Sequence, residues 1–139
     1  MGIPCQALKM GVLRMNNLLN ICLRFALRKE KRNEQFLHWS FIIQRGQIVE
    51  WGTNRVGNPP MSLGYKKWQQ RHAETEAIRR ARGILDRNQP WEIVNIRINR
   101  LGEVRNSKPC ECCERALQIV GCSRVWFTSE KGFQKVDIQ

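Results

Sequence analysis

The sequence predicts an α/β domain. Two stretches place apolar residues at helical spacing, a third is bounded by Pro109 and Gly121, and five short runs are rich in β-branched and aromatic residues. A chain of 139 residues is the size of one domain and can bury a core without disulfide staples. We therefore expect a single domain over residues 16–139. Residues 1–15 have no clear period and are expected to form a loosely ordered basic leader.

The first half of the chain is expected to form a helix, a β-hairpin and a second helix. The first helix runs from Asn16 to about Arg32, and its basic end is interpreted as a solvated face that suits a helix C-terminus. Two strands over residues 38–44 and 48–52 are joined around Arg45-Gly46-Gln47. The second helix is expected from His72 to about Asp86.

The second half is expected to form a strand, a helix and a closing pair of strands. The strand covers residues 91–100, and the helix runs from Cys110 to about Val120, with Pro109 at its first position and Gly121 at its end. The last two strands, residues 123–128 and 133–138, have only a short connection. Parallel strands need a crossover of about a dozen residues or more, so this pair must be antiparallel if it forms.

The charge balance favours an anionic partner. The chain has 24 Lys and Arg against 12 Asp and Glu, a formal net charge of +12. Such a surface attracts polyphosphate chains, so we expect single-stranded DNA or RNA as a partner, with a pyrimidine nucleotide as the alternative. A basic surface that serves only solubility is the simpler interpretation.

Targeting signals are not evident in the sequence. The apolar run over residues 18–27 contains Arg24 and is followed by a cluster of cations, so neither a secretory signal nor a membrane span is expected. A reducing, cytoplasmic location is therefore expected, with Cys5, Cys22 and Cys122 as ordinary thiols.

A long connection between the hairpin and the second helix combines aromatic and basic residues. Bases can stack on aromatic rings while cations follow the phosphate backbone. The candidate nucleic-acid contacts are Arg55, Tyr65, Lys66, Lys67, Trp68 and Arg71. A Trp in such a loop can equally be a packing anchor.

Four residues form a candidate zinc site. His72, Cys110 and Cys113 supply one imidazole and two thiolates, and three protein ligands leave the fourth tetrahedral position open for water. Glu74, two residues after the histidine, can then move protons without binding the metal. A helix-start histidine or buried thiols would each have a structural explanation alone, but their joint occurrence favours a catalytic site. The sequence does not exclude Cys112 from the metal.

Other acidic and imidazole groups have simpler interpretations. Glu76 in the first helical turn can serve as a partner of the helix dipole. His38 lies in a predicted strand and is interpreted as a structural or surface residue.

These residues also carry a resemblance. His72-Ala73-Glu74, followed by Pro109-Cys110-x-x-Cys113, resembles the H-x-E and P-C-x-x-C signature of the cytidine deaminase superfamily. The resemblance covers roughly residues 39–138. It implies a three-layer α/β/α fold with a mixed five-stranded sheet, two metal-bearing helices on one face and the first helix on the other. The antiparallel C-terminal hairpin resembles free cytidine deaminases and several toxin or RNA-editing deaminases.

The resemblance implies further roles. Zn²⁺ would be the cofactor, the Ala73 backbone N–H would contact the base carbonyl, and the Lys108 carbonyl would accept from the exocyclic amine. Asn54 would contact the sugar, unless it is a plain turn residue. Two departures put the substrate in doubt: Arg55-Val56 stands where nucleoside deaminases have Val-Glu, and Ser107 stands where APOBEC-type enzymes have an aromatic ring.

The sequence therefore predicts a zinc-dependent hydrolytic deaminase. It would convert cytosine to uracil with release of ammonia, most readily within single-stranded nucleic acid. The alternative is a dCMP-type deaminase of free cytidine or deoxycytidine nucleotides. Adenine deamination, suggested by Asn54-Arg55, and a non-catalytic zinc domain that binds nucleic acid are lesser alternatives. Assembly into a homo-oligomer is an expectation from the same resemblance.

Overall fold

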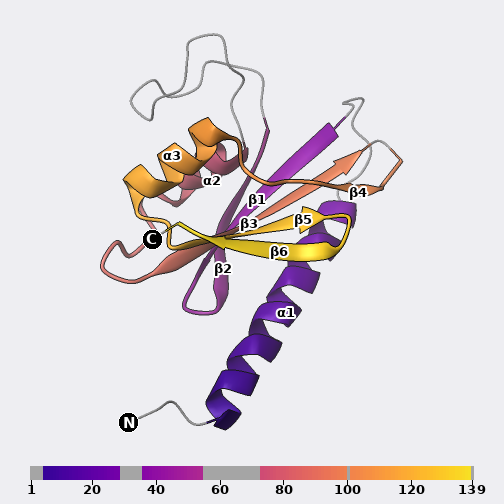
Figure 1. Ribbon diagram of the computed structural model, residues 1–139. Helices are drawn as coiled ribbons and strands as arrows, with labels where there is room; N and C mark the ends of the chain where they lie inside the picture. The colour runs from indigo at the N-terminus through magenta and orange to yellow at the C-terminus, as the bar shows by residue number, and fades with distance from the viewer. Residues whose placement is uncertain (1–4, 29–35, 55–72, 100, 139) are drawn as a thin grey trace.

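A mixed β-sheet forms the centre of the computed structural model (Figure 1). The structure describes residues 5–28, 36–54, 73–99 and 101–138. The strand order is β2-β1-β3-β5-β6, with β4 paired to β3, and only the β3–β5 pair is parallel among the described strands. The helices are α1 (Cys5–Arg28), α2 (Ala73–Ala81) and α3 (Glu111–Val120), and the strands are β1 (Phe36–Gln44), β2 (Gln47–Thr53), β3 (Trp91–Asn99), β4 (Val104–Arg105), β5 (Arg124–Ser129) and β6 (Gly132–Asp137).

Both faces of the sheet are covered, which confirms the predicted three-layer arrangement (Figure 1). Successive side chains of a strand point to opposite faces. In β1, Trp39 and Phe41 are buried against α1, whereas Ile42 is buried on the face that carries α2 and α3. In β3, Val94 is buried on the α1 face and Ile93 on the face that carries α2 and α3. The two apolar cores are therefore separated by the sheet itself.

Helix α1 is longer at its start than the sequence predicted. It begins at Cys5 instead of Asn16 and is described as far as Arg28, so the predicted continuation to Arg32 lies outside the described residues. The stretch over residues 5–15 lacks an apolar period but is rich in Ala, Leu, Lys, Met and Arg, which are strong helix formers. From Cys5 onward, the expected leader is thus part of a regular helix. Helix α1 packs on the sheet through aromatic contacts. The Phe25 ring of α1 lies edge-on to Trp39 of β1, with centroids 5.7 Å apart.

Both predicted hairpins are present. In the first, Arg45 and Gly46 have φ values of 55° and 71°, the left-handed pair that a two-residue type I′ turn requires. The closing hairpin pairs β5 and β6 in antiparallel register from Arg124 opposite Asp137 to Ser129 opposite Gly132. The sheet has one strand more than the predicted five, because Val104–Arg105 folds back onto β3. Two residues are too short a run to show a strand period.

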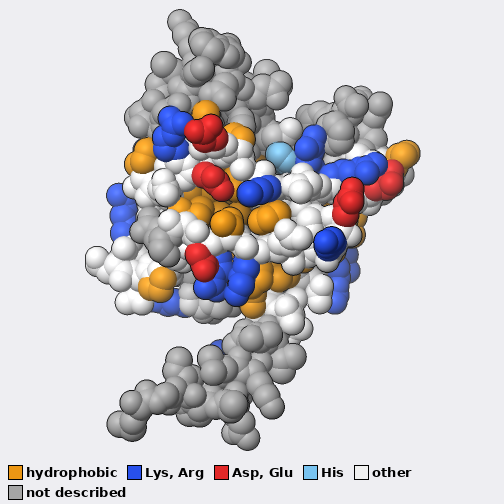
Figure 2. All heavy atoms as spheres, viewed as in Figure 1, with side chains coloured by type: hydrophobic (Ala, Val, Ile, Leu, Met, Phe, Trp, Pro, Cys, Tyr) orange, Lys and Arg blue, Asp and Glu red, His pale blue; other side chains and the backbone are white. Residues whose placement is uncertain are grey.

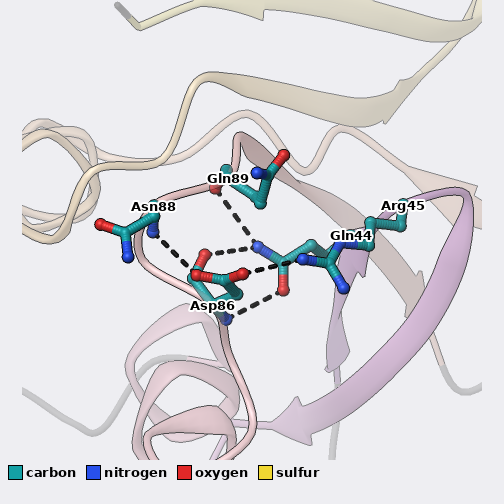
Figure 3. A network of polar contacts seen from close by, with 5 residues as sticks. All are labelled: Gln44, Arg45, Asp86, Asn88 and Gln89. Atoms are coloured by element: carbon teal, nitrogen blue, oxygen red, sulfur yellow. Dashed lines mark hydrogen bonds and ion pairs between the residues drawn. The ribbon is translucent and has the colours of Figure 1, made fainter.

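Helix α2 is shorter than the sequence predicted, ending at Ala81 instead of near Asp86. The Ile84 and Leu85 N–H groups both donate to the Ala81 carbonyl at 2.9 Å, so the chain turns away there. The loop that follows is tied to the end of β1 by the polar network in Figure 3, in which the Gln44 side chain bonds to Asp86 and Gln89 backbone groups. Arg45 adds an ion pair to Asp86 at 2.8 Å, and the Asn88 N–H donates to the Asp86 carboxylate.

Helix α3 begins one residue later than predicted. Cys110 is its N-cap, so Pro109 lies outside the helix instead of at its first position. Its C-terminal end is as predicted: Gly121 has φ 88°, and the Gly121 and Cys122 N–H groups donate to the carbonyls of the last turn. No helix in the described part of the chain is long and apolar enough to cross a membrane.

Candidate active site

Glu74 is a buried carboxylate between helices α2 and α3. It lies in the first turn of α2 and is only 4% exposed. The Asn95 side-chain amide donates to its Oε1 at 2.8 Å, and the Cys113 Sγ lies 3.4 Å from its Oε2. A carboxylate is taken out of water only where polar partners hold it. The Glu74 carboxylate therefore has Oε1 directed toward Asn95 of β3 and Oε2 directed toward Cys113, a predicted metal ligand.

Asn95 is a site residue that the sequence analysis missed. It is 3% exposed in the middle of β3, and its Oδ1 accepts from the Ser40 hydroxyl at 2.7 Å. Val94 and Ile96 on either side are buried in the opposite core. A polar residue between apolar neighbours in a predicted strand was the available signal. Asn95 connects β1 to Glu74.

Ser107 fixes the segment that leads into α3. Its hydroxyl donates to the Asn95 carbonyl and accepts from the Thr128 N–H, both at 2.7 Å, and its own N–H donates to the Thr128 carbonyl at 2.9 Å. This residue is 3% exposed. Ser107 therefore acts by anchoring the chain between β3 and β5. The sequence analysis considered it only as a missing aromatic pocket wall.

The predicted thiol ligands both lie in the first turn of α3. Cys110 is the exposed N-cap, and Cys113, three residues later, is completely buried. Cysteine binds a metal ion as the thiolate. Cys112 is half-buried and packs against Cys113 and Ala116. The structure thus brings Glu74 and Cys113 together, and their predicted roles at a metal stay predictions.

Glu76 has a different partner. Its carboxylate accepts two hydrogen bonds from the Arg79 guanidinium, at 2.7 and 3.2 Å, and is 3% exposed. This pairing raises the pKa of Arg79, chiefly through the hydrogen bond to Glu76. Glu76 therefore forms an ion pair within α2.

The three predicted substrate contacts lie among the described residues. Ala73 is 1% exposed and begins α2 directly before Glu74. Lys108 is exposed, and its N–H donates to the Asn106 side chain at 2.9 Å. Asn54 follows β2, and its Oδ1 accepts from the His38 N–H at 3.1 Å. Their contacts with a substrate remain predictions.

Several predicted residues lie outside the described residues. They are the ligand His72 and the candidate nucleic-acid contacts Arg55, Tyr65, Lys66, Lys67, Trp68 and Arg71. Within the described ranges, no group of three His, Cys, Asp or Glu side chains could hold a metal ion. The described donors are of the kind that zinc binds, because Cys110 and Cys113 supply two sulfur atoms from the start of one helix. The Glu74 carboxylate lies beside Cys113 and accepts a hydrogen bond from Asn95.

The fold of this chain is similar to that of a solved structure, whereas its sequence matches no family model or curated protein. No protein-family model matches the sequence, and no curated protein matches it. Among solved structures, the cytidine deaminase from Mycobacterium leprae matches with a TM-score of 0.52 and 13% sequence identity, covering 87% of this chain and 92% of that one. The chain has a cytidine deaminase-like fold. The mixed sheet, apart from its additional strand β4, the helix layers and the closing hairpin were predicted.

Proposed function

We propose that this protein is a zinc-dependent hydrolytic deaminase that converts cytosine to uracil and releases ammonia. One observation carries the proposal: the buried Glu74 carboxylate is held by Asn95 at 2.8 Å and lies 3.4 Å from the Cys113 sulfur. A domain with a purely structural metal has no need of a buried acid beside its ligands. The cytidine deaminase-like fold supports the same reaction.

The residues of the chain divide the proposed chemistry among them. His72, Cys110 and Cys113 would hold Zn²⁺, which supplies Lewis-acid activation of water. Glu74 removes one proton from water as the oxygen bonds to C4 of cytosine, and delivers it to ring nitrogen N3. It then carries the second water proton to the exocyclic amine. The C4–N bond breaks, ammonia leaves, and C4 keeps the oxygen as the carbonyl of uracil.

Asn95 holds the Glu74 carboxylate in place during both proton transfers. Its amide donates to Oε1, so the other oxygen keeps its direction toward Cys113. The Ser40 hydroxyl holds the Asn95 amide in turn, at 2.7 Å. This chain of hydrogen bonds supplies the preorganisation on which general acid–base catalysis depends.

We propose cytosine within a single-stranded nucleic acid as the first substrate class. The net charge of +12 supports it, and Lys and Arg side chains are distributed over the face drawn in Figure 2. Free deoxycytidine nucleotides are the second class. The antiparallel β5–β6 hairpin favours them, since free cytidine deaminases share this feature.

Side-by-side turnover tests both classes. Zinc-loaded protein is incubated with deoxycytidine 5′-monophosphate and with a single-stranded oligonucleotide that contains one cytosine, and uracil and ammonia are quantified. Mass spectrometry of the product base also reveals any action on adenine. We expect uracil from the oligonucleotide. Release from the mononucleotide with an inert oligonucleotide would select the second class, and no product from any substrate by protein with stoichiometric zinc would contradict the deaminase proposal.

A further inference from the structure

Three basic side chains form a row across the sheet next to the candidate active site. His38 of β1 pairs with Arg97 of β3, and Arg97 pairs with Arg105 of β4. Paired residues on neighbouring strands have side chains on the same face, about 5 Å apart. We call His38, Arg97 and Arg105 the basic row.

The basic row lies on the face of the sheet that carries Glu74. The residues next to its members, Leu37 and Ile96, are buried in the core under α1, so His38 and Arg97 point to the other face. Asn95, the hydrogen-bond partner of Glu74, precedes Arg97 by two residues and shares its face. Two residues of strand span about 7 Å. Arg97 therefore lies far enough from the Glu74 carboxylate for the sugar of a nucleotide to fit between them.

Hydrogen bonds fix the backbone of the basic row. The Arg97 N–H donates to the Thr128 hydroxyl at 3.4 Å, and the same hydroxyl donates to the Arg105 carbonyl at 2.7 Å. His38 and Asn54 exchange two hydrogen bonds, of 3.1 and 3.3 Å. The row thus begins beside Asn54, the predicted sugar contact.

The row places the guanidinium groups of Arg97 and Arg105 on paired positions of neighbouring strands. Arg105 has an ion pair with Glu103 at 3.6 Å, but these side chains are 48% and 53% exposed, so the pair contributes little. Glu103 also accepts from the Asn99 side chain at 3.1 Å. Two neighbouring guanidinium groups match the geometry of a phosphate and can each donate to its oxygens.

We propose that the basic row binds the phosphate of the substrate whose cytosine lies at Glu74. This inference rests on the proposed function, and it deepens it by naming the residues that bind the phosphate of the substrate. The base would lie against Glu74, the sugar near Asn54, and the phosphate over Arg97 and Arg105. The phosphate belongs either to a free nucleotide or to a nucleic-acid strand, and the experiment distinguishes these sources.

Binding measurements test the row without requiring turnover. In a Glu74→Gln background, the affinities of deoxycytidine, deoxycytidine 5′-monophosphate and a cytosine-containing oligonucleotide are measured at one salt concentration. Arg97→Gln and Arg105→Gln are each compared with Arg87→Gln, which removes the same charge from the exposed loop between α2 and β3. Arg97→Lys keeps the charge and controls for folding.

We expect Arg97→Gln and Arg105→Gln each to weaken binding of a phosphorylated ligand about tenfold, with deoxycytidine unchanged. Arg97→Lys should retain most of the affinity and Arg87→Gln all of it. A loss for the mononucleotide identifies a nucleotide phosphate, and a loss for the oligonucleotide alone identifies a strand phosphate. Equal effects in Arg105→Gln and Arg87→Gln, or no binding of either phosphorylated ligand, would overturn the proposal. Because these are binding constants, they stand even if the protein deaminates nothing.

Discussion

Two glutamates in one helical turn have different roles because they have different neighbours. Glu74 faces the sheet and α3, where Asn95 and Cys113 contact its two oxygens. Glu76 is equally buried but has the Arg79 guanidinium on its own helix. The proposed function therefore assigns proton transfer to Glu74, which lies beside Cys113, and an ion pair within α2 to Glu76.

Replacing Glu74 by Gln should stop turnover while leaving the fold and metal content unchanged. The amide has the same shape and can still accept from Asn95, but it cannot take a proton. General acid–base catalysis contributes about 10²–10⁴-fold, so kcat should fall by at least that factor. Ammonia release and zinc stoichiometry measure the two properties. The matched control is Glu76→Gln, which loses the Arg79 pair and should keep turnover; an active Glu74→Gln protein would refute the mechanism.

Replacing Asn95 by Ala should show whether Asn95 positions the Glu74 carboxylate or binds the substrate. Ser40 and Glu74 would lose a buried hydrogen-bond partner, which costs about 1–3 kcal/mol of stability. The carboxylate would also lose its fixed direction, so we expect kcat to fall about tenfold or more with KM little changed. Asn99→Ala, at the exposed end of the same strand, is the control. A change confined to KM would show that Asn95 acts on the substrate instead.

At the scale of elements, helix α2 reaches the sheet because Gly52 has no side chain. A Cβ atom at this position would lie 2.5 Å from the Ala77 nitrogen and 3.0 Å from the Ala73 carbonyl oxygen. Real Cβ atoms do not approach backbone so closely. The glycine therefore sets the distance between β2 and the helix turn that carries Glu74.

Gly52→Ala should push α2 away from β2. Overpacking of this kind costs about 1–3 kcal/mol in the free energy of unfolding. Because Glu74 moves with α2, we expect its contact with Cys113 to lengthen and kcat to fall as well. Gly83→Ala is the matched control, since open space surrounds that position. Denaturant unfolding and turnover of the two variants give the result, and equal stability of both would show that α2 packs differently.

The elements could be predicted more fully than the contacts between them. The type I′ turn at Arg45-Gly46 and the cap at Gly121 follow from local chemistry, so the sequence located both. The start of α1 and the end of α2 depended on helix propensity and on packing against the sheet, and these two boundaries were wrong. The hydrogen bond between Ser40 and Asn95 joins positions 55 residues apart. No local pattern encodes such a pairing, which is why Asn95 and the anchoring role of Ser107 were missed.

At the scale of the whole molecule, each of the two cores contains one buried thiol. Cys22 lies under α1 on one face of the sheet, and Cys122 lies with α2 and α3 on the other. Burial raises the pKa of both thiols from an ordinary value of 9.0 to about 12. The charge of Glu92 adds to the effect at Cys122. Each thiol therefore stays protonated in the folded protein at a pH where the unfolded chain has lost the proton.

The stability of the fold should decline above pH 9 for this reason. A raised folded pKa contributes stability that is complete below the unfolded pKa and is lost as the pH rises toward the folded value, here between 9.0 and about 12. From pH 8 to pH 10 each thiol should cost about 1.4 kcal/mol. We expect Cys22→Ala and Cys122→Ala each to remove that amount from the pH dependence of urea unfolding, whatever their stability at pH 8. If both variants follow the parent curve between pH 8 and 10, the thiols exchange with solvent and the two cores are more open than the structure describes.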